Sequence, residues 1–290
     1  MSSIVLNTLC DEIKKIKSQS WKDDILTDKD ISILRSESTT ESPFDPLNLK
    51  KKMFEAYENK SAKVIVKRCD CARVVILQEN DSQTFPWATW SRIFQWFGKL
   101  KNEPWQIYLY ASSVNRTLPE SGPIGPAELN GGYTYPCSSD CIVIYRYEEC
   151  TRVLVHELLH AACTDDHTKP VELKEAATEA WAELFLVAVL AKGNKLKAEE
   201  LWKIQSQYIQ DLNYTVRTFH NVNSIQDYGS RYTTLRESVF KQFGVNLEAH
   251  IPKRIQISRF TSPDLDTTWF NTNVLIEVHV FFLNYFYKLE

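Results

Sequence analysis

The sequence predicts an α+β fold, with an N-terminal mixed β-sheet flanked by helices and a mainly helical C-terminal half. Three observations support this prediction. The β-branched runs that are bounded by turn residues lie between residues 62 and 145. A helical pattern separates two of these runs, so residues 72–111 are expected to form a strand–helix–strand unit. Beyond residue 165 the pattern of apolar residues is helical.

Strands are expected in the first half of the chain. Residues 1–50 are charged and helix-tending, and Pro43 and Pro46 mark a linker near the end of this segment. A helix begins at Pro86 and ends near Gly98. The Pro- and Gly-rich stretch before the last two short strands is typical of a loop. The strands are expected at residues 62–68, 72–78, 105–111, 133–135 and 141–145.

The second half is expected to consist of helices. One begins near residue 152, the next runs from Pro170 to Gly193, and two more follow at 197–212 and 224–243. The chain is therefore expected to contain three regions, of which the last two form one unit. They are a helical, charged segment with its linker (1–50), an α/β subdomain with an edge strand (51–145) and a helical subdomain (146–290).

Composition and charge argue against several classes of protein. Hydrophobic residues make up 43% and charged residues 24% of the chain, which is typical of a soluble globular protein. The net charge of −3 gives no electrostatic reason to expect a nucleic-acid or membrane partner. The N-terminus lacks the pattern of a secretory signal, and the most apolar stretches, 180–191 and 274–287, are too short to span a bilayer. A cytoplasmic location is therefore expected.

The pentapeptide HELLH at residues 156–160 is the strongest indication of function. On a helix, His156 and His160 lie one turn apart on the same face and can offer two imidazole nitrogens to one ion, which is the spacing that zinc requires. Glu157 is displaced around the helix and could act as a base toward a metal-bound water. The pentapeptide also occurs as plain helix in proteins without a metal. Its apolar helix, preceded by a strand, favours one zinc ion per chain.

Catalytic zinc usually takes three protein ligands, so a third is expected elsewhere. His167 follows His160 at the wrong spacing for a third histidine and without the glycine that such a pattern needs. Asp165 and Asp166 are expected to end the helix. Three glutamates of the next helix are better candidates, because they are spaced by four on one face of an apolar helix, where carboxylates need a partner. They are Glu175, Glu179 and Glu183.

HELLH followed by eighteen residues and Glu179 resembles the H-E-x-x-H-x18-E signature of the gluzincin zinc metallopeptidases. The segment TEAWAELF around Glu179 is similar to the N-E-x-x-A segment that carries their third ligand. The resemblance covers about residues 130–186, and its motif is specific for this clan. It implies a zincin-like metallopeptidase fold in which His156, His160 and Glu179 bind zinc and Glu157 is the general base.

The resemblance has further implications. Glu183, one turn beyond the third ligand, would orient a ligand histidine. Thr178 stands where Asn is common, and the G-A-M-E-N element is absent, which argues against an aminopeptidase of that type. In such enzymes an edge strand pairs with the substrate backbone, and GGYTYP at residues 131–136 is the candidate. Its glycines are equally typical of a hairpin.

The oxyanion that forms during peptide hydrolysis needs a hydrogen-bond donor, and Tyr or His usually supplies it. Tyr228, Tyr232 and Arg236 are spaced at i, i+4 and i+8, so they are expected to share one face of a helix. The two tyrosines are therefore the candidates for this role. A packed aromatic face with a surface arginine is the alternative.

The predicted function is zinc-dependent hydrolysis of peptide bonds in a peptide or protein substrate, with Glu157 as general base. One alternative is a binding or structural module that has kept the fold, and another is a zinc hydrolase that acts on a non-peptide amide. The intact Glu157 weighs against a structural site, because such a site needs no base.

The seven cysteines lack the spacing of a disulfide framework, so free and mostly buried thiols are expected. The pairs Cys69-x-Cys71 and Cys137-x3-Cys141 could together hold a structural zinc, but the first pair is unusually close. The aromatic stretch 278–290 is expected to pack into the core. An oligomer contact or a segment lying in the cleft is the alternative for this stretch.

Overall fold

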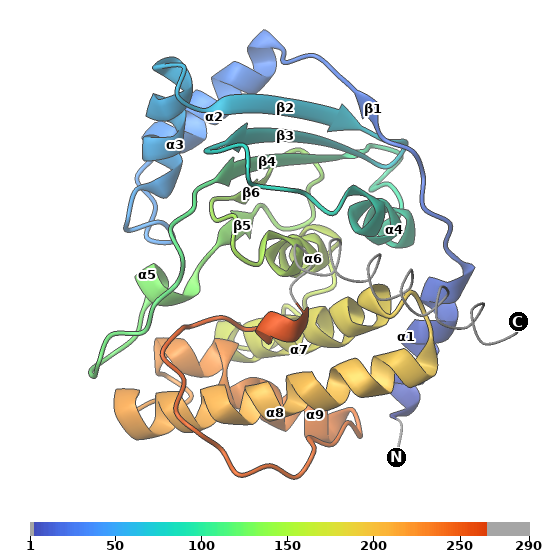
Figure 1. Ribbon diagram of the computed structural model, residues 1–290, viewed down its shortest axis with the longest axis vertical. Coiled ribbons are helices and arrows are strands. Elements are labelled where there is room, and N and C mark those ends of the chain that lie inside the picture. The colour runs from blue at the N-terminus through green and yellow to red at the C-terminus, as the bar shows by residue number, and fades with distance from the viewer. Residues whose placement is uncertain (1–2, 266–290) are drawn as a thin grey trace, which may run out of the picture.

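The computed structural model describes residues 3–265, which form a mixed β-sheet with helices on both faces (Figure 1). The strands are β1 (Lys22–Asp23), β2 (Lys63–Arg68), β3 (Ala72–Gln78), β4 (Trp105–Ala111), β5 (Gly132–Thr134) and β6 (Ile142–Ile144). Their order across the sheet is β1-β2-β3-β4-β6-β5. β3, β4 and β6 run parallel, whereas β1, β2 and β5 pair antiparallel with their neighbours. β5 therefore lies at one edge of the sheet.

Helices form the layers on either side of this sheet. The α-helices are α1 (Ile4–Lys15), α2 (Asp28–Thr39), α3 (Leu49–Glu58), α4 (Trp87–Phe97), α5 (Pro126–Leu129), α6 (Cys150–Ala161), α7 (Val171–Leu190), α8 (Lys195–His220) and α9 (Thr234–Gln242). Two 3₁₀ helices, η1 (Tyr228–Tyr232) and η2 (Pro263–Leu265), complete the description. α2 and α3 cover one face, and α4 and α6 cover the other. α7 packs against α6, with α1, α8 and α9 around it (Figure 1).

Apolar side chains of the central strands alternate between two cores. Val74 and Ile76 of β3 face the core that is shared with α4, α6 and α7, whereas Val75 and Leu77 face the core under α2 and α3. Because helices cover both faces, β3 and β4 are almost continuously apolar instead of alternating with polar residues. The larger core places α6 between the sheet and α7, which positions the HELLH helix at the centre of the molecule.

The predicted α+β class is confirmed, with an N-terminal mixed sheet and a mainly helical C-terminal half. The predicted strand–helix–strand unit at 72–111 is β3, α4 and β4, and the expected strands form within about one residue of their predicted bounds. The helix expected at 224–243 is wrong in part. The chain there forms η1 and then α9, because Thr233, with φ −132° and ψ −88°, interrupts the helical backbone.

Two predictions concern the apolar stretches of the chain. Among residues 3–265, no helix is both long enough and apolar enough to cross a bilayer. The stretch 180–191 belongs largely to α7 and packs in the larger core. The predictions for 274–287 and for the aromatic stretch 278–290 lie outside the described residues.

Candidate metal site

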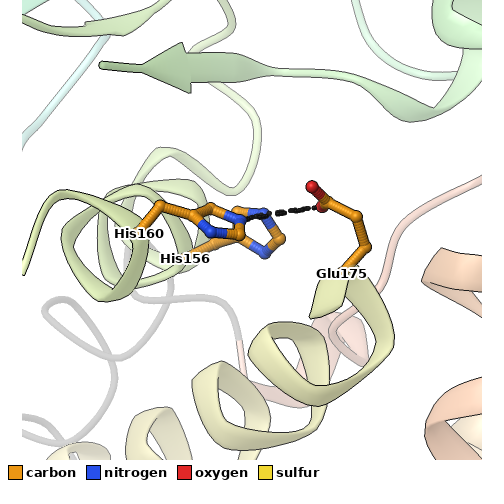
Figure 2. Close-up of side chains that lie close together, drawn as sticks. All are labelled: His156, His160 and Glu175. Atoms are coloured by element: carbon orange, nitrogen blue, oxygen red, sulfur yellow. Dashed lines mark hydrogen bonds and ion pairs between the residues drawn. The ribbon is translucent and has the colours of Figure 1, made fainter. Parts of the chain in front are cut away.

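Helix α6 carries both histidines of HELLH through the larger core. All of its residues are buried, because the helix lies between the sheet and α7. His156 and His160 project from one face of α6 toward the first half of α7 (Figure 2). Their Nε2 atoms lie 3.1 Å apart. The structure thus brings the two imidazoles together, as the spacing of the motif predicts.

Glu175 of α7 completes this group. Its Oε2 atom lies 3.4 Å from Nε2 of His156 and 3.7 Å from Nε2 of His160 (Figure 2). With bonds of about 2.0–2.1 Å to zinc, the donors of a tetrahedral site lie about 3.3 Å apart. The three donor separations, 3.1, 3.4 and 3.7 Å, bracket this value. The group of His156, His160 and Glu175 could therefore hold a metal ion.

Carboxylates also face the other ring nitrogen of each histidine. Both carboxylate oxygens of Asp165 lie 2.9 Å from Nδ1 of His160, and Oε1 of Glu179 lies 3.1 Å from Nδ1 of His156. In a neutral imidazole, a hydrogen bond from Nδ1–H to a carboxylate leaves Nε2 unprotonated, which is the metal-binding tautomer. Asp165 can fix this tautomer in His160, whereas Nδ1 of His156 lies near Glu179 without forming a hydrogen bond. Two Nε2 atoms and a carboxylate oxygen at these distances need a positive charge among them, which either a proton on His160 or a metal ion can supply. This donor set fits a metal ion.

The structure places Glu179 and Glu183 deeper than Glu175 along the same face of α7. Glu179 accepts a hydrogen bond from Arg152 of α6 through Oε2, and its other oxygen faces Nδ1 of His156, not Nε2. Glu179, which the gluzincin spacing favours as a ligand, thus lies behind His156 and outside the group that could hold the ion.

Glu183 does not contact either histidine in the described hydrogen bonds and ion pairs. It accepts hydrogen bonds from Arg236 at 2.7 Å and from Gln205, and it lies 3.6 Å from Arg152. The carboxylates that lie next to Nδ1 of the two histidines are instead Glu179 at His156 and Asp165 at His160, so the position predicted for Glu183 is wrong. His167, which its spacing argued against as a ligand, is exposed in the loop after α6 and lies outside the group.

Glu157 lies in the same cavity as the histidines and is 6% exposed. Burial raises the pKa of Glu157 to about 8 and lowers the pKa of His156 to about 4. Burial also opposes the protonation of His160, but the adjacent Glu175 carboxylate outweighs it and raises the pKa of His160 to about 9. Burial opposes ionisation of Glu175 as well, yet the two histidines hold its pKa well below the usual range. The group behaves as one coupled set of charges.

A cavity of about 230 Å³ lies above these residues and is bounded on one side by β5. The prediction that GGYTYP forms an edge strand is confirmed, because β5 is the last strand of the sheet. Its first residue, Gly132, packs closely on α6. A Cβ atom there would lie 2.7 Å from the backbone oxygen of Val143, 2.7 Å from Val153 and 3.4 Å from Glu157. The glycine thus lets the strand approach Glu157.

The two predicted tyrosines differ in position. Tyr232 lines the cavity, and its ring centroid lies 6.5 Å from that of His156. Tyr228 donates a hydrogen bond of 2.7 Å to the side chain of Asn130, so its hydroxyl proton is already used. The alternative of a packed aromatic face with a surface arginine is correct for the two tyrosines, whose ring centroids lie 5.4 Å apart against a buried cluster. It is wrong for Arg236, which is fully buried and paired with Glu183.

The expectation of free thiols is wrong for two cysteines. Cys137, just beyond β5, forms a disulfide with Cys163, just beyond α6. The bond links the segment after β5 to the segment after α6. Cys141 is free and buried next to Glu37, and among the described residues the four cysteines proposed for a structural zinc do not form a metal-binding group.

Comparison with protein-family models, with curated proteins and with solved structures finds no match for this chain.

Proposed function

We propose that this protein is a zinc-dependent hydrolase of peptide bonds, with His156, His160 and Glu175 as the metal ligands. The observation that carries the proposal is the convergence of two Nε2 atoms and one carboxylate oxygen at spacings of 3.1–3.7 Å. The hydrogen bond between Asp165 and Nδ1 of His160 supports it, because that bond favours the metal-binding tautomer. A site with three protein ligands leaves a coordination position for water, as catalytic zinc sites do.

Zinc in this site would lower the pKa of a bound water and polarise the carbonyl of the scissile bond. Glu157 would accept the proton of that water and deliver it to the leaving amine. Its buried position beside the histidines, and the close approach of Gly132 of β5, support this role. A purely structural zinc site would need neither a base nor a cavity.

The edge strand would bind the substrate backbone. Tyr145, directly after β6, donates its N–H to the carbonyl of Gly131 at 2.8 Å, so the backbone groups of residues 131 and 133 point toward β6. The backbone groups of Gly132 and Thr134 then point to the open edge beside the cavity. An extended peptide could add there as a further strand and place one of its carbonyls near the metal. This favours a peptide over a small non-peptide amide.

Tyr232 is the better of the two tyrosine candidates for stabilising the oxyanion. Its ring lines the cavity beside His156, whereas Tyr228 does not line the cavity and donates its hydroxyl proton to Asn130. The two tyrosine hydroxyls also form a hydrogen bond with each other, which Tyr232 would have to exchange for one to the oxyanion. A neutral phenol can donate to an oxyanion, and burial holds the pKa of Tyr232 well above its usual value, so the proton is retained.

The test is the Glu157→Gln variant of the zinc-loaded protein. Wild-type protein should bind one zinc ion and cleave members of a mixed peptide library, and the variant should bind the same amount of zinc but lose cleavage by about 10²–10⁴-fold. Glu199→Gln, a change at an exposed glutamate of α8, is the matched control and should keep full activity. Zinc binding without cleavage of any peptide by the wild type would instead favour a binding module. Failure to bind zinc would refute the site.

A further inference from the structure

Phe44, in the loop between α2 and α3, lines part of the cavity wall, so the N-terminal segment contributes to this cavity. The Phe44 ring is 46% exposed although its backbone is held in place. Its carbonyl accepts hydrogen bonds from the hydroxyl of Tyr145 and, at 3.5 Å, from the side chain of Asn130. The next residue, Asp45, accepts the N–H groups at the start of α3 at 2.9 and 3.0 Å. A large aromatic ring is thus presented to the cavity on a fixed backbone.

Tyr133, the middle residue of β5, lies beside Phe44, with the ring centroids 6.1 Å apart. The far end of its side chain is also fixed. The Tyr133 hydroxyl accepts a hydrogen bond from Lys50 at 2.7 Å and donates one to Glu37 at 2.5 Å. Lys50 is itself only 2% exposed. The polar group of Tyr133 is therefore used inside the protein, and the ring is the part that remains for the cavity.

Alternation along the strand separates these aromatic rings from α6. Gly132 faces α6, because a Cβ atom there would meet Val153 and Glu157. Tyr133 points to the opposite face of the sheet, where it packs with the core under α2 and α3. A peptide added beside β5 would alternate in the same way, so the residue opposite Tyr133 would direct its side chain toward Tyr133 and Phe44.

We propose that Phe44 and Tyr133 form an apolar subsite that selects a large aliphatic or aromatic side chain at one position of an extended peptide. The flanking positions, whose side chains face α6, would not show this preference. The inference rests on the proposed function in so far as it places a peptide along β5. It adds that the N-terminal segment, which sequence reasoning left without a role, contributes to the choice of substrate.

The experiment measures binding and cleavage separately. Zinc-loaded Glu157→Gln protein is immobilised and equilibrated with a random heptapeptide mixture, and the captured pool is sequenced. Large apolar residues should be enriched by about tenfold at one position and not at its neighbours. Introducing Phe44→Ala into the same Glu157→Gln protein should remove most of this enrichment. Tyr214→Ala is the matched control, because Tyr214 is a 40% exposed aromatic residue on α8 that does not line the cavity, and it should have no effect.

The outcomes separate this inference from the proposed function. The subsite is overturned if the captured peptides show no positional preference. It is also overturned if they show the same enrichment with Phe44→Ala as without it. Both conclusions hold even if the wild-type protein hydrolyses these peptides. A Phe44-dependent preference without hydrolysis by the wild type would support the subsite and count against the peptidase. Capture of no peptide at all would overturn the subsite. Synthetic peptides with Leu or Ala at the enriched position, bound to the Glu157→Gln protein with Phe44 intact, test the positional preference independently. The Leu peptide should bind more tightly, and equal affinities would overturn the subsite.

Discussion

Replacing Glu175 by Gln should remove most of the zinc affinity, whereas the same change at Glu179 should only weaken it. Glu175 lies at 3.4 and 3.7 Å from the two Nε2 atoms, so its oxygen would lie about 2 Å from a bound ion. A unit negative charge at that distance from a dication contributes about 4 kcal/mol even at the dielectric constant of water, or about a thousandfold in Kd. Gln keeps the size of the side chain but removes this charge.

Glu179 and Asp165 lie one imidazole further out, at about 6 Å from the same ion. The same calculation at this distance gives about 1.4 kcal/mol, or about tenfold in the Kd for zinc. This agrees with the roughly 10–100-fold loss of metal affinity that follows mutation of carboxylates hydrogen-bonded to metal ligands. Asp165→Asn is the better outer variant, because Asp165 contacts His160 without an arginine partner among the described ion pairs. Glu179→Gln also leaves Arg152 with one fewer partner.

The assay is competition for zinc between the protein and a chelating dye, with thermal unfolding used to show that each variant is folded. The expected order of zinc affinity is wild type, then Asp165→Asn and Glu179→Gln, and then Glu175→Gln at least tenfold below both. If Glu179→Gln loses zinc while Glu175→Gln retains it within tenfold of the wild type, the ligand assignment from this geometry is refuted. Glu179 would then be the third ligand, as the gluzincin spacing implies.

Three further changes test the structure around the site. Reducing the Cys137–Cys163 disulfide, which spans 26 residues, should lower the free energy of unfolding by about 3.5 kcal/mol in urea titrations with and without dithiothreitol. Gly132→Ala should lower it by about 1–3 kcal/mol, because the new Cβ would lie 2.7 Å from a backbone oxygen of the sheet and from a side chain of α6. Asp30→Asn should lower it by about 1.5–3 kcal/mol at neutral pH, since it removes the charge that pairs at 2.7 Å with the half-buried Arg73, which keeps Asp24 as a partner. Burial opposes ionisation of Asp30, but Arg73 holds its pKa below the usual 3.8. This stabilisation is therefore present above pH 3.8 and is lost as the pH falls through the pKa of the folded state. In urea titrations from neutral to acidic pH, the free energies of unfolding of the wild type and Asp30→Asn should converge.

Each of these changes has a matched control. Cys69→Ser, at a cysteine that is free, should leave the effect of the reductant unchanged, and loss of the effect would contradict the disulfide assignment. Gly125→Ala should change stability by less than about 0.5 kcal/mol, since the new Cβ would come no closer than 3.9 Å to its neighbours. Asp23→Asn removes a pair in which the carboxylate is 88% exposed and should have no measurable effect. A Gly132→Ala protein as stable as the Gly125→Ala protein would argue against close packing of β5 on α6.

The local parts of the site could be predicted from the sequence. The i, i+4 spacing of His156 and His160 fixes their separation once the segment is helical, and the apolar residues around them make it so. The edge strand was also recognisable, because short β-branched runs and flanking glycines are local features. The pairing of Cys137 with Cys163 was not, since it depends on how the end of β5 meets the end of α6.

The choice among the three glutamates of α7 depends on how two helices align. α6 and α7 are joined by a short loop and run antiparallel, so successive turns pair in reverse order. His160 meets Glu175, His156 meets Glu179, and one turn further back Arg152 lies near the third glutamate. The sequence contains a signal for this order, because Arg152 lies four residues before His156 on the same face and offers a charge partner for the deeper carboxylates. Spacing from the histidines alone cannot reveal it.

The balance of charge along these two helices explains why the outermost glutamate is the one suited to a metal. Glu179 and Glu183 are matched by the buried guanidinium groups of Arg152 and Arg236. Among the ion pairs of the described residues, Glu175 faces only histidines, and so does Asp165. Burying these carboxylates is costly unless a positive charge lies beside them, and the nearby arginines are already paired with Glu179 and Glu183. Without a metal ion, a proton on His160 is the positive charge that remains. A dication between His156, His160 and Glu175 would supply that charge, so the arginines that stabilise the inner carboxylates also determine which one remains for the ion.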